Sequence, residues 1–281
     1  MLGHLALVTD STAYLPQDAV DRHRIRVVPL SVVVGDEVRT EGIEISPKDV
    51  AEALRSKHRV TTSRPSPETF AAAYRAAAEA GATGIVSVHI SAELSGTAEA
   101  AQLAAAAVDI PVRVVDSRLV GMALGACVLA AAEAAEAGHD LDEVAAAATR
   151  QSGLTSGFFY VDTLEHLRRG GRIGTARALV GSALAVKPLL HLSGGRIEPL
   201  EKVRTASRAI ARLEEIAVEC AGEQEVDIAV HHLAAEDRAE PLAERLRERV
   251  PGLRELYLSE VGAVIGAHVG PGLLAVVVSP R

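Results

Sequence analysis

The chain has 281 residues, enough for about two domains with sizeable cores, which excludes a small scaffold held together by disulfides or a structural metal. Its 29 basic and 37 acidic residues give a formal net charge of −8, and the basic residues form no tract, which argues against nucleic acid as a partner. Aromatic residues make up 2% of the chain and Trp is absent, so alanine, valine and leucine must supply the core.

Short apolar stretches alternate with alanine-rich segments of helical period, which predicts an α/β fold with a largely parallel sheet in the N-terminal part. In the first half, strands are predicted at residues 5–9, 26–34, 84–90 and 112–116. Helices are predicted to begin at Ser46-Pro47 and Ser66-Pro67, because Ser caps free N–H groups and Pro fits the first helical position. Gly81 is predicted to end the second of these helices.

Asp140 and Glu143 form a capping-box pattern, which predicts a helix running to about Gln151. Small polar residues interrupt the pattern at 153–157, so we expect an N-terminal α/β domain of residues 1–153 and a C-terminal α/β domain of residues 154–281. The elements predicted for the second half are a strand at 157–161, a helix from Thr163, a Gly/Arg-rich turn at 170–174, a further helix, a hairpin turning at 193–195, a helix at 205–221 and strands at 226–231 and 253–258. The final strand, at 273–278, fits either sheet.

Cys127 and Cys220 stand 93 positions apart and lack the paired spacing of a zinc site or a redox motif, so both are predicted to be small buried hydrophobes in a reducing compartment. The first residues lack a basic leader and a long apolar run, and the alanine-rich stretches are interrupted well before about 20 residues. These observations predict a cytoplasmic protein without stable membrane insertion. No phosphate-binding P-loop motif is present, and no metal or cofactor is expected.

Candidate ligand contacts lie where polar residues follow predicted strands, because ligands of open α/β sheets gather at the carboxyl ends of the strands. Four hydroxyl-rich clusters qualify, at residues 9–12, 61–66, 91–97 and 116–117. Ser95, Gly96 and Thr97 precede an alanine-rich helix, whose free N–H groups suit a carboxylate or a phosphate. The same residues fit a Ser or Thr that only caps the helix. A nucleophile elbow would require glycine where Glu93 stands, which weakens a hydrolase assignment.

Three further features complete the candidate set. Thr62 and Ser63 offer hydroxyl donors to the same anion, although their segment also fits a turn before a capped helix. His268 is predicted to lie in a glycine-rich loop, from which the imidazole either donates to a carboxylate or is merely exposed. The arginines of 168–172, together with Arg204, fit phosphate contact or docking of an acidic partner, and they equally fit a solvated helix end.

The ordered set of these motifs resembles the DegV family, whose members serve as fatty-acid-binding carrier subunits of bacterial fatty acid kinase. The matching segments span almost the whole chain, at residues 9–12, 61–65, 94–97, 116–117, 163–173, 187–188, 201–204 and 268–272. The resemblance implies a two-domain fold that buries a long-chain fatty acid in a tunnel and holds its carboxylate near the domain interface. The positions that match the carboxylate contacts are Thr62, Ser63, Ser95, Gly96 and His268.

The resemblance also implies a partner and a place in phospholipid metabolism. In the family, a separate ATP-using kinase subunit docks on the carrier and phosphorylates the bound carboxylate to an acyl phosphate, so the carrier itself is not an enzyme. Arg172 and Arg204 stand in the motifs that match the docking arginines. One departure is Arg64, where the family commonly shows Gln, and this places a cation beside the expected head-group site.

Physical chemistry agrees with a lipid carrier, because a buried carboxylate needs convergent neutral donors and an acyl tail needs only an apolar wall. One alternative is a stand-alone enzyme, either an acyl hydrolase that uses Ser95 and His268 or a small-molecule phosphotransferase. Another is a sensor module that binds an acidic metabolite. Turnover by the isolated chain would favour an enzyme, whereas retention of a long-chain fatty acid would favour the carrier.

Overall fold

The computed structural model describes residues 4–179 and 187–281, which divide into two compact units. The N-terminal unit contains the residues up to Ser31 together with Ser63–Leu154, and the C-terminal unit contains Val32–Thr62 together with the chain from Thr155 onward. The domain boundary predicted after residue 153 lies one residue before the point where the chain passes from the N-terminal unit, at Leu154, to the C-terminal unit, at Thr155. The segment 32–62, by contrast, belongs with the C-terminal unit, although the sequence places it in the N-terminal domain.

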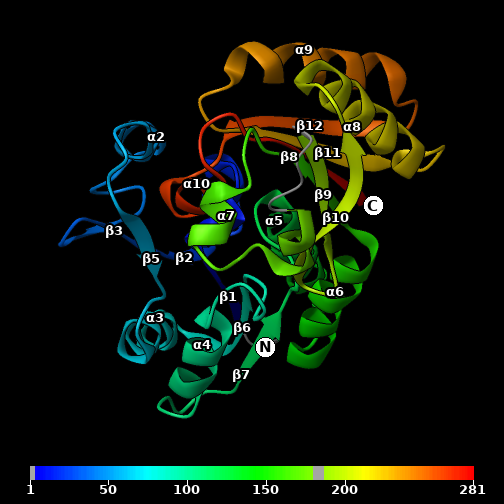
Figure 1. Ribbon diagram of the computed structural model, residues 1–281. Coiled ribbons are helices and arrows are strands. Elements are labelled where there is room, and N and C mark those ends of the chain that lie inside the picture. The colour runs from blue at the N-terminus through cyan, green and yellow to red at the C-terminus, as the bar shows by residue number, and fades with distance from the viewer. Residues whose placement is uncertain (1–3, 180–186) are drawn as a thin grey trace. The chain divides into compact units, whose positions relative to one another are not determined.

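The N-terminal unit is built around a parallel sheet in the order β2-β1-β6-β7, as predicted from the alternating pattern. Its elements are β1 (His4–Asp10), the 3-10 helix η1 (Ser11–Ala13), α1 (Gln17–Arg22), β2 (Arg26–Val28), α3 (Pro67–Glu79), β6 (Ala82–His89), α4 (Thr97–Ala105), β7 (Val112–Asp116), α5 (Met122–Glu136) and α6 (Leu141–Leu154). Helices α3 and α4 pack on one face of the sheet, and α5 and α6 pack on the other (Figure 1). Because both faces are covered, the central strands are buried along most of their length.

Local hydrogen bonds confirm the predicted helix starts. Ser46 Oγ accepts the Asp49 N–H at 3.2 Å while the Asp49 carboxylate accepts the Ser46 N–H at 2.8 Å. In the same way, the Asp140 carboxylate accepts the Glu143 N–H at 2.9 Å, and the Glu143 carboxylate accepts the Asp140 N–H at 3.0 Å. These contacts satisfy N–H groups that a helix end otherwise leaves free.

The single strand predicted at residues 26–34 is wrong, because the structure divides this stretch into β2 and a separate strand, β3 (Ser31–Val34). Strand β2 pairs with β1, whereas β3 belongs to a small sheet with β4 (Glu37–Thr40) and β5 (Val60–Ser63), in the order β4-β3-β5. Pro29 stands at the break. A proline has no N–H to contribute to a ladder, so the chain leaves one sheet there and enters another.

The C-terminal unit contains a six-stranded sheet in the order β10-β9-β8-β13-β11-β12, in which only β11 and β12 pair in parallel. Its strands are β8 (Ser156–Tyr160), β9 (Lys187–Ser193), β10 (Arg196–Val203), β11 (Val226–His232), β12 (Leu253–Glu260) and β13 (Leu274–Pro280). Its helices are α7 (Glu165–Arg169), the 3-10 helix η2 (Gly174–Leu179), α8 (Ala206–Ala221), α9 (Glu236–Arg249) and α10 (Ala263–Val269). The final strand lies between β8 and β11, which assigns it to this sheet.

Helices α8 and α9 cover one face of this sheet and enclose the main core of the unit (Figure 1). The segment 32–62 adds β4 (Glu37–Thr40), α2 (Pro47–Arg55) and β5 (Val60–Ser63), and α2 packs on α10. The helix predicted after the turn at 170–174 begins as η2, and its continuation at 180–186 lies outside the described residues.

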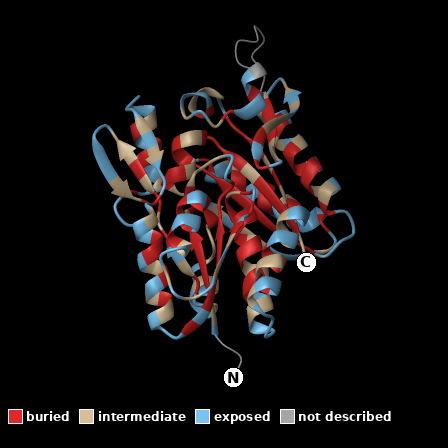
Figure 2. Cartoon of the chain, turned by 90° about the horizontal axis from the view of Figure 1, so that it is seen from below, coloured by how far each residue is buried: buried red, intermediate tan, exposed pale blue. Residues whose placement is uncertain are grey.

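Buried residues follow the strands and the inward faces of the helices, and exposed residues cover the outward faces (Figure 2). Cys127 is buried in α5, where burial raises the pKa of its thiol to about 12, and Cys220 is half-buried. Cys127 thus behaves as the small hydrophobe that the sequence predicts. Within 4–179 and 187–281, no helix has both the length and the apolar character needed to cross a membrane.

Candidate functional site

Thr62 and His268 form a hydrogen-bonded pair in the C-terminal unit. Thr62 Oγ1 lies 2.8 Å from His268 Nε2, although the two residues are 206 positions apart in the sequence. Thr62 is half-buried in β5, and Ser63, the last residue of that strand, is exposed. The structure therefore brings together two of the residues that the resemblance assigns to a carboxylate.

The expectation that His268 lies in a glycine-rich loop is wrong, because Ala263–Val269 form helix α10. Gly270 follows with φ +74°, a conformation that favours glycine at the end of a helix. Gly266 lies inside the helix, where an added Cβ would be 3.1 Å from a methyl group of Leu233. One glycine thus ends the helix and another allows close packing, so a glycine-rich sequence still forms a helix.

The N-terminus of α10 is held by Glu41, a buried carboxylate from the segment 32–62. Glu41 Oε1 accepts the Val264 N–H at 2.7 Å. A negative charge at this end stabilises a helix through its free N–H groups and its dipole. The segment 32–62 therefore positions the helix that carries His268.

The imidazole of His268 is held in its neutral form. Burial, reinforced by the nearby Arg172 guanidinium, lowers the pKa of His268 to about 4. Arg172 Nη1 in turn donates to the Gly170 carbonyl at 2.7 Å. His268 Nδ1 is buried and has no hydrogen-bond partner among the residues that the structure describes. At neutral pH the ring therefore has one N–H donor and one acceptor nitrogen.

Ser95 and Gly96 lie at the start of α4 in the N-terminal unit. Gly96 is the N-cap residue, and no side chain in the described part of the chain caps this helix, so the interpretation of Ser95 or Thr97 as a simple cap is wrong. Ser95 Oγ instead lies 2.8 Å from Thr97 Oγ1. The first N–H groups of α4 keep the partial positive charge that favours an anion.

Arg64 lies against Gly96, and its charge is matched locally. Arg64 Nη1 donates to the Gly96 carbonyl at 2.9 Å and to the Glu99 carboxylate at 2.5 Å. An added Cβ at Gly96 would lie 2.1 Å from the same Nη1. Arg64 is therefore paired with Glu99, and the absence of a side chain at Gly96 makes room for it.

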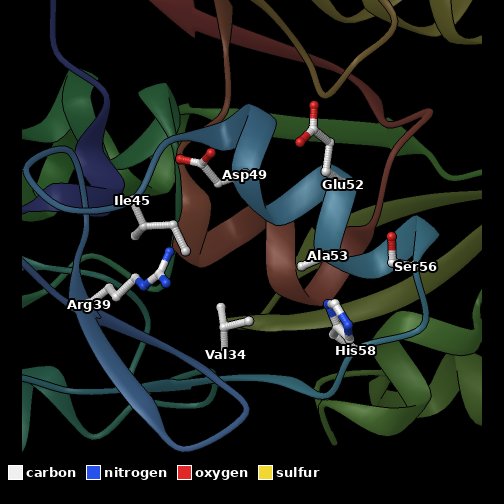
Figure 3. A pocket seen from close by; sticks show the side chains of 8 residues that line it. All are labelled: Val34, Arg39, Ile45, Asp49, Glu52, Ala53, Ser56 and His58. Carbon is white, nitrogen blue, oxygen red and sulfur yellow. The ribbon is translucent and has the colours of Figure 1, made fainter.

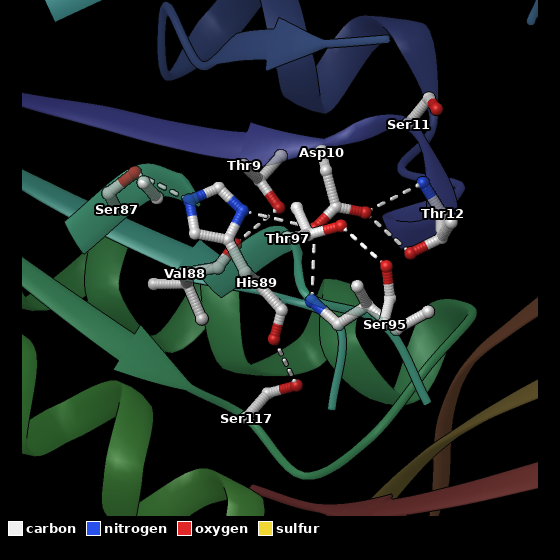
Figure 4. A network of polar contacts seen from close by, with 12 residues as sticks. Thr9, Asp10, Ser11, Thr12, Ser87, Val88, His89, Ser95, Thr97 and Ser117 are labelled. Atoms are coloured by element: carbon white, nitrogen blue, oxygen red, sulfur yellow. Dashed lines mark hydrogen bonds and ion pairs between the residues drawn. The ribbon is translucent and has the colours of Figure 1, made fainter. Parts of the chain in front are cut away.

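A buried polar chain lies at the centre of the N-terminal unit (Figure 4). Tyr74 Oη donates to Ser87 Oγ at 2.8 Å, Ser87 Oγ lies 2.7 Å from His89 Nε2, and His89 Nδ1 lies 3.0 Å from Asp10 Oδ2. Burial raises the pKa of Tyr74 to about 12, so its hydroxyl keeps its proton. Asp10, Ser87 and His89 have the order of a catalytic triad but are 0% exposed, which assigns them to the support of the fold.

This polar chain holds the backbone that leads to Ser95. Asp10 Oδ2 also accepts the Ile90 N–H at 2.9 Å, and the Ser91 carbonyl accepts the Ser95 N–H at 3.0 Å. The hydroxyl-rich cluster at residues 9–12 includes Asp10, whereas no predicted cluster includes Tyr74, Ser87 or His89. A signal was available, because Ser87 and His89 alternate within the otherwise apolar strand β6.

The arginine-rich segment is only partly available to a partner. Arg168 and Arg169 form ion pairs with Glu165 at 2.7 and 2.8 Å. Arg172 is half-buried, whereas Arg204 is exposed between β10 and α8. Of the two arginines that match the docking motifs, Arg204 is the one whose charge faces solvent.

A separate hollow of about 290 Å³ lies in the C-terminal unit beside α2 (Figure 3). Arg39 lines one side, and Asp49 and Glu52 line another. The carboxylate-binding residues predicted from the sequence do not line this hollow. Its open and mixed-charge wall suits neither an acyl tail nor a lone carboxylate.

The family model described as "Uncharacterised protein, DegV family COG1307" matches residues 4–281, and the chain belongs to the DegV family. A DegV domain-containing protein of Streptomyces coelicolor is 66% identical over 281 residues, covering 100% of both chains.

Solved structures of the family agree with this fold. A fatty-acid-binding DegV family protein of Thermus thermophilus matches with a TM-score of 0.94 and 36% identity, covering 99% of this chain and 100% of that one. DegV of Bacillus subtilis, described as a fatty acid binding protein, matches with a TM-score of 0.91 and 35% identity, covering 99% of this chain and 100% of that one.

Proposed function

We propose that this chain binds a long-chain fatty acid and presents its carboxylate to a separate ATP-dependent kinase subunit, which converts it to an acyl phosphate. The proposed carboxylate contacts are Thr62, Ser63, Ser95, Gly96 and His268. The chain supplies binding and orientation, and the kinase subunit supplies the nucleotide and the phosphoryl transfer.

The observation that carries the proposal is the half-buried pair of Thr62 and a neutral His268, whose side chains lie 2.8 Å apart. A carboxylate removed from water requires donors that replace its lost hydration. Neutral donors meet this need and leave the carboxylate with its charge, so the oxygens remain nucleophilic toward a phosphoryl group. The fatty acids bound by the Thermus thermophilus and Bacillus subtilis relatives support the same ligand class.

Burial of the acyl tail supplies most of the affinity under this proposal. At about 0.8 kcal/mol for each buried CH₂ group, a tail of roughly fourteen methylenes contributes on the order of 10 kcal/mol before the cost of ordering the ligand. The head-group contacts therefore set the orientation of the acid more than its affinity.

The first experiment is mass spectrometry of an organic extract from the purified chain, with native mass spectrometry of the intact species. We expect a long-chain fatty acid in a stoichiometric amount. A chain that carries no fatty acid and takes up none when it is added would refute the proposal. A small polar ligand in its place would favour the sensor alternative.

A second experiment separates ligand binding from kinase docking. Reversing the exposed Arg204 to Glu should slow acyl phosphate formation by a fatty acid kinase subunit and leave lipid retention unchanged, because a charge at a docking surface acts mainly on encounter. Arg22→Glu, at another exposed arginine, is the matched control and should change neither quantity. Loss of lipid in Arg204→Glu would place this residue in the binding site instead.

The hydrolase alternative requires the Ser95 hydroxyl to donate to a histidine, whereas its hydrogen-bond partner is Thr97 and the partner of His268 is Thr62. Assays of ester and phosphate turnover with the isolated chain test this alternative directly. Turnover that disappears in Ser95→Ala would favour an enzyme over the carrier.

A further inference from the structure

Gly170, at the end of α7, packs directly against the imidazole of His268. An added Cβ at Gly170 would lie 2.2 Å from His268 Nδ1 and 2.9 Å from Cε1. The backbone at Gly170 has φ −73°, which any residue adopts. Glycine is therefore needed here for the close approach of the ring and not for the backbone conformation.

This close approach decides which nitrogen of His268 carries the hydrogen. Nδ1 is buried against Gly170 and has no hydrogen-bond partner among the described residues. A buried N–H without an acceptor is rarer in proteins than a buried acceptor without a donor, so the hydrogen is favoured on Nε2. Nε2 faces Thr62 Oγ1 at 2.8 Å, and the ring then donates to the hydroxyl.

A threonine hydroxyl that accepts from His268 keeps its own hydrogen for a different acceptor. His268 then acts on the carboxylate through Thr62, in place of the direct contact named under the proposed function. We propose that Gly170 is a positioning residue of the carboxylate site: by leaving His268 Nδ1 without a partner, it selects the Nε2–H tautomer and so directs the Thr62 hydroxyl hydrogen to the ligand carboxylate. This inference rests on the proposed function, because the acceptor is the carboxylate of the bound fatty acid.

A second contact between a glycine and a histidine also joins helices α7 and α10. An added Cβ at Gly270, at the end of α10, would lie 2.2 Å from His166 Cδ2. Helices α7 and α10 thus exchange contacts, because a histidine of each packs on a glycine of the other. Arg172 also holds the α7 turn through its hydrogen bond to the Gly170 carbonyl. The placement of Gly170 against His268 is therefore built into the packing of the unit.

The first test reads the tautomer in the ligand-free chain by ¹⁵N NMR of the imidazole nitrogens, with His268→Gln to assign the signals. We expect a protonated Nε2 and an unprotonated Nδ1 for His268 at pH 7. The opposite pattern would overturn the inference. Because this measurement needs no ligand, it stays decisive even if the chain takes up no fatty acid, the result that would refute the proposed function.

The second test is Gly170→Ala, whose added methyl group displaces the ring without straining the backbone. We expect about tenfold weaker fatty acid binding, the loss that follows when one hydrogen bond to a charged group is removed. Gly153→Ala is the matched control, because no atom of the described residues lies within 4 Å of a Cβ added at Gly153 in α6, and it should bind as the wild type does.

A double-mutant cycle separates positioning from general damage to the fold. In a His268→Gln background, Gly170→Ala should cause no further loss of binding, because its effect passes through His268. An equal loss in both backgrounds would overturn the inference. If Gly170→Ala does not fold, the NMR assignment of the wild-type ring still decides between the two tautomers.

Discussion

The buried imidazole of His268 should make the chain lose stability between pH 7 and pH 5. The folded chain holds this ring neutral, since burial and the Arg172 guanidinium lower the pKa of His268 to about 4, whereas an unfolded chain has the ordinary value of 6.5. Between these two values the unfolded chain binds more protons than the folded one. The contribution is therefore complete above pH 6.5 and is lost as the pH falls toward 4.

The size of the effect follows from the separation of the two pKa values. At pH 5 the unfolded histidine is almost fully protonated and the folded one is mostly neutral, which costs about 2 kcal/mol of unfolding free energy relative to pH 7. Burial also lowers the pKa of His166 and of His231, so these rings add to the loss of the whole chain, and the share of His268 is isolated by comparison with a variant that lacks this ring.

The assay is urea unfolding of the wild type and of His268→Gln at pH 7 and pH 5, followed by circular dichroism. Glutamine is neutral at both values, so the variant should lose about 2 kcal/mol less than the wild type over this interval. Other titrating groups contribute equally to both proteins and cancel in the comparison. Identical losses in the two proteins would show that His268 is not held neutral and would refute the reasoning.

Two further predictions concern the cores of the two units. Tyr74→Phe removes the hydroxyl that donates to Ser87 at 2.8 Å. Because a buried hydrogen bond is lost, the unfolding free energy measured by urea titration should fall by about 1 to 2 kcal/mol. An unchanged urea midpoint would show that this hydrogen bond does not stabilise the fold. Glu214, buried in α8, accepts from Arg245 at 2.5 Å and from Arg249 at 2.6 Å; burial by itself favours the neutral acid, but the two arginines prevail and lower the pKa of Glu214. Glu214→Gln should therefore cost about 2 kcal/mol at pH 7. This difference should shrink as the pH falls below the ordinary value of 4.5 toward the lowered pKa of the folded carboxylate, and a constant difference across the pH range would contradict the assignment.

The sequence alone determined the features whose causes are local. The capping contacts of Ser46 with Asp49 and of Asp140 with Glu143 join residues three positions apart, so their patterns predict helix starts directly. The β-hairpin at 193–195 and the buried strands of the parallel sheet were predicted for the same reason. Each depends on turn chemistry or apolar periodicity that can be read in a short window.

No single motif was specific enough to predict the family, but the order of all the motifs along the chain predicted both the family and the two-part α/β fold. The sequence did not predict that 26–34 divides at Pro29, or that the segment 32–62 belongs with the C-terminal unit. Both depend on which sheet offers a strand its hydrogen bonds. The sheet that a strand joins depends on residues that are distant in sequence, so the local sequence indicates it only weakly.

Only the tertiary structure paired His268 with Thr62, placed His268 in a helix and set Gly170 against its ring. A glycine appears in a sequence as a break in a helical pattern, whether it ends a helix or makes room for a neighbouring side chain. The two roles differ only in what lies beside the missing Cβ. For Gly170 that neighbour is an imidazole almost a hundred positions away along the chain, so the packing of α7 and α10 decides its role.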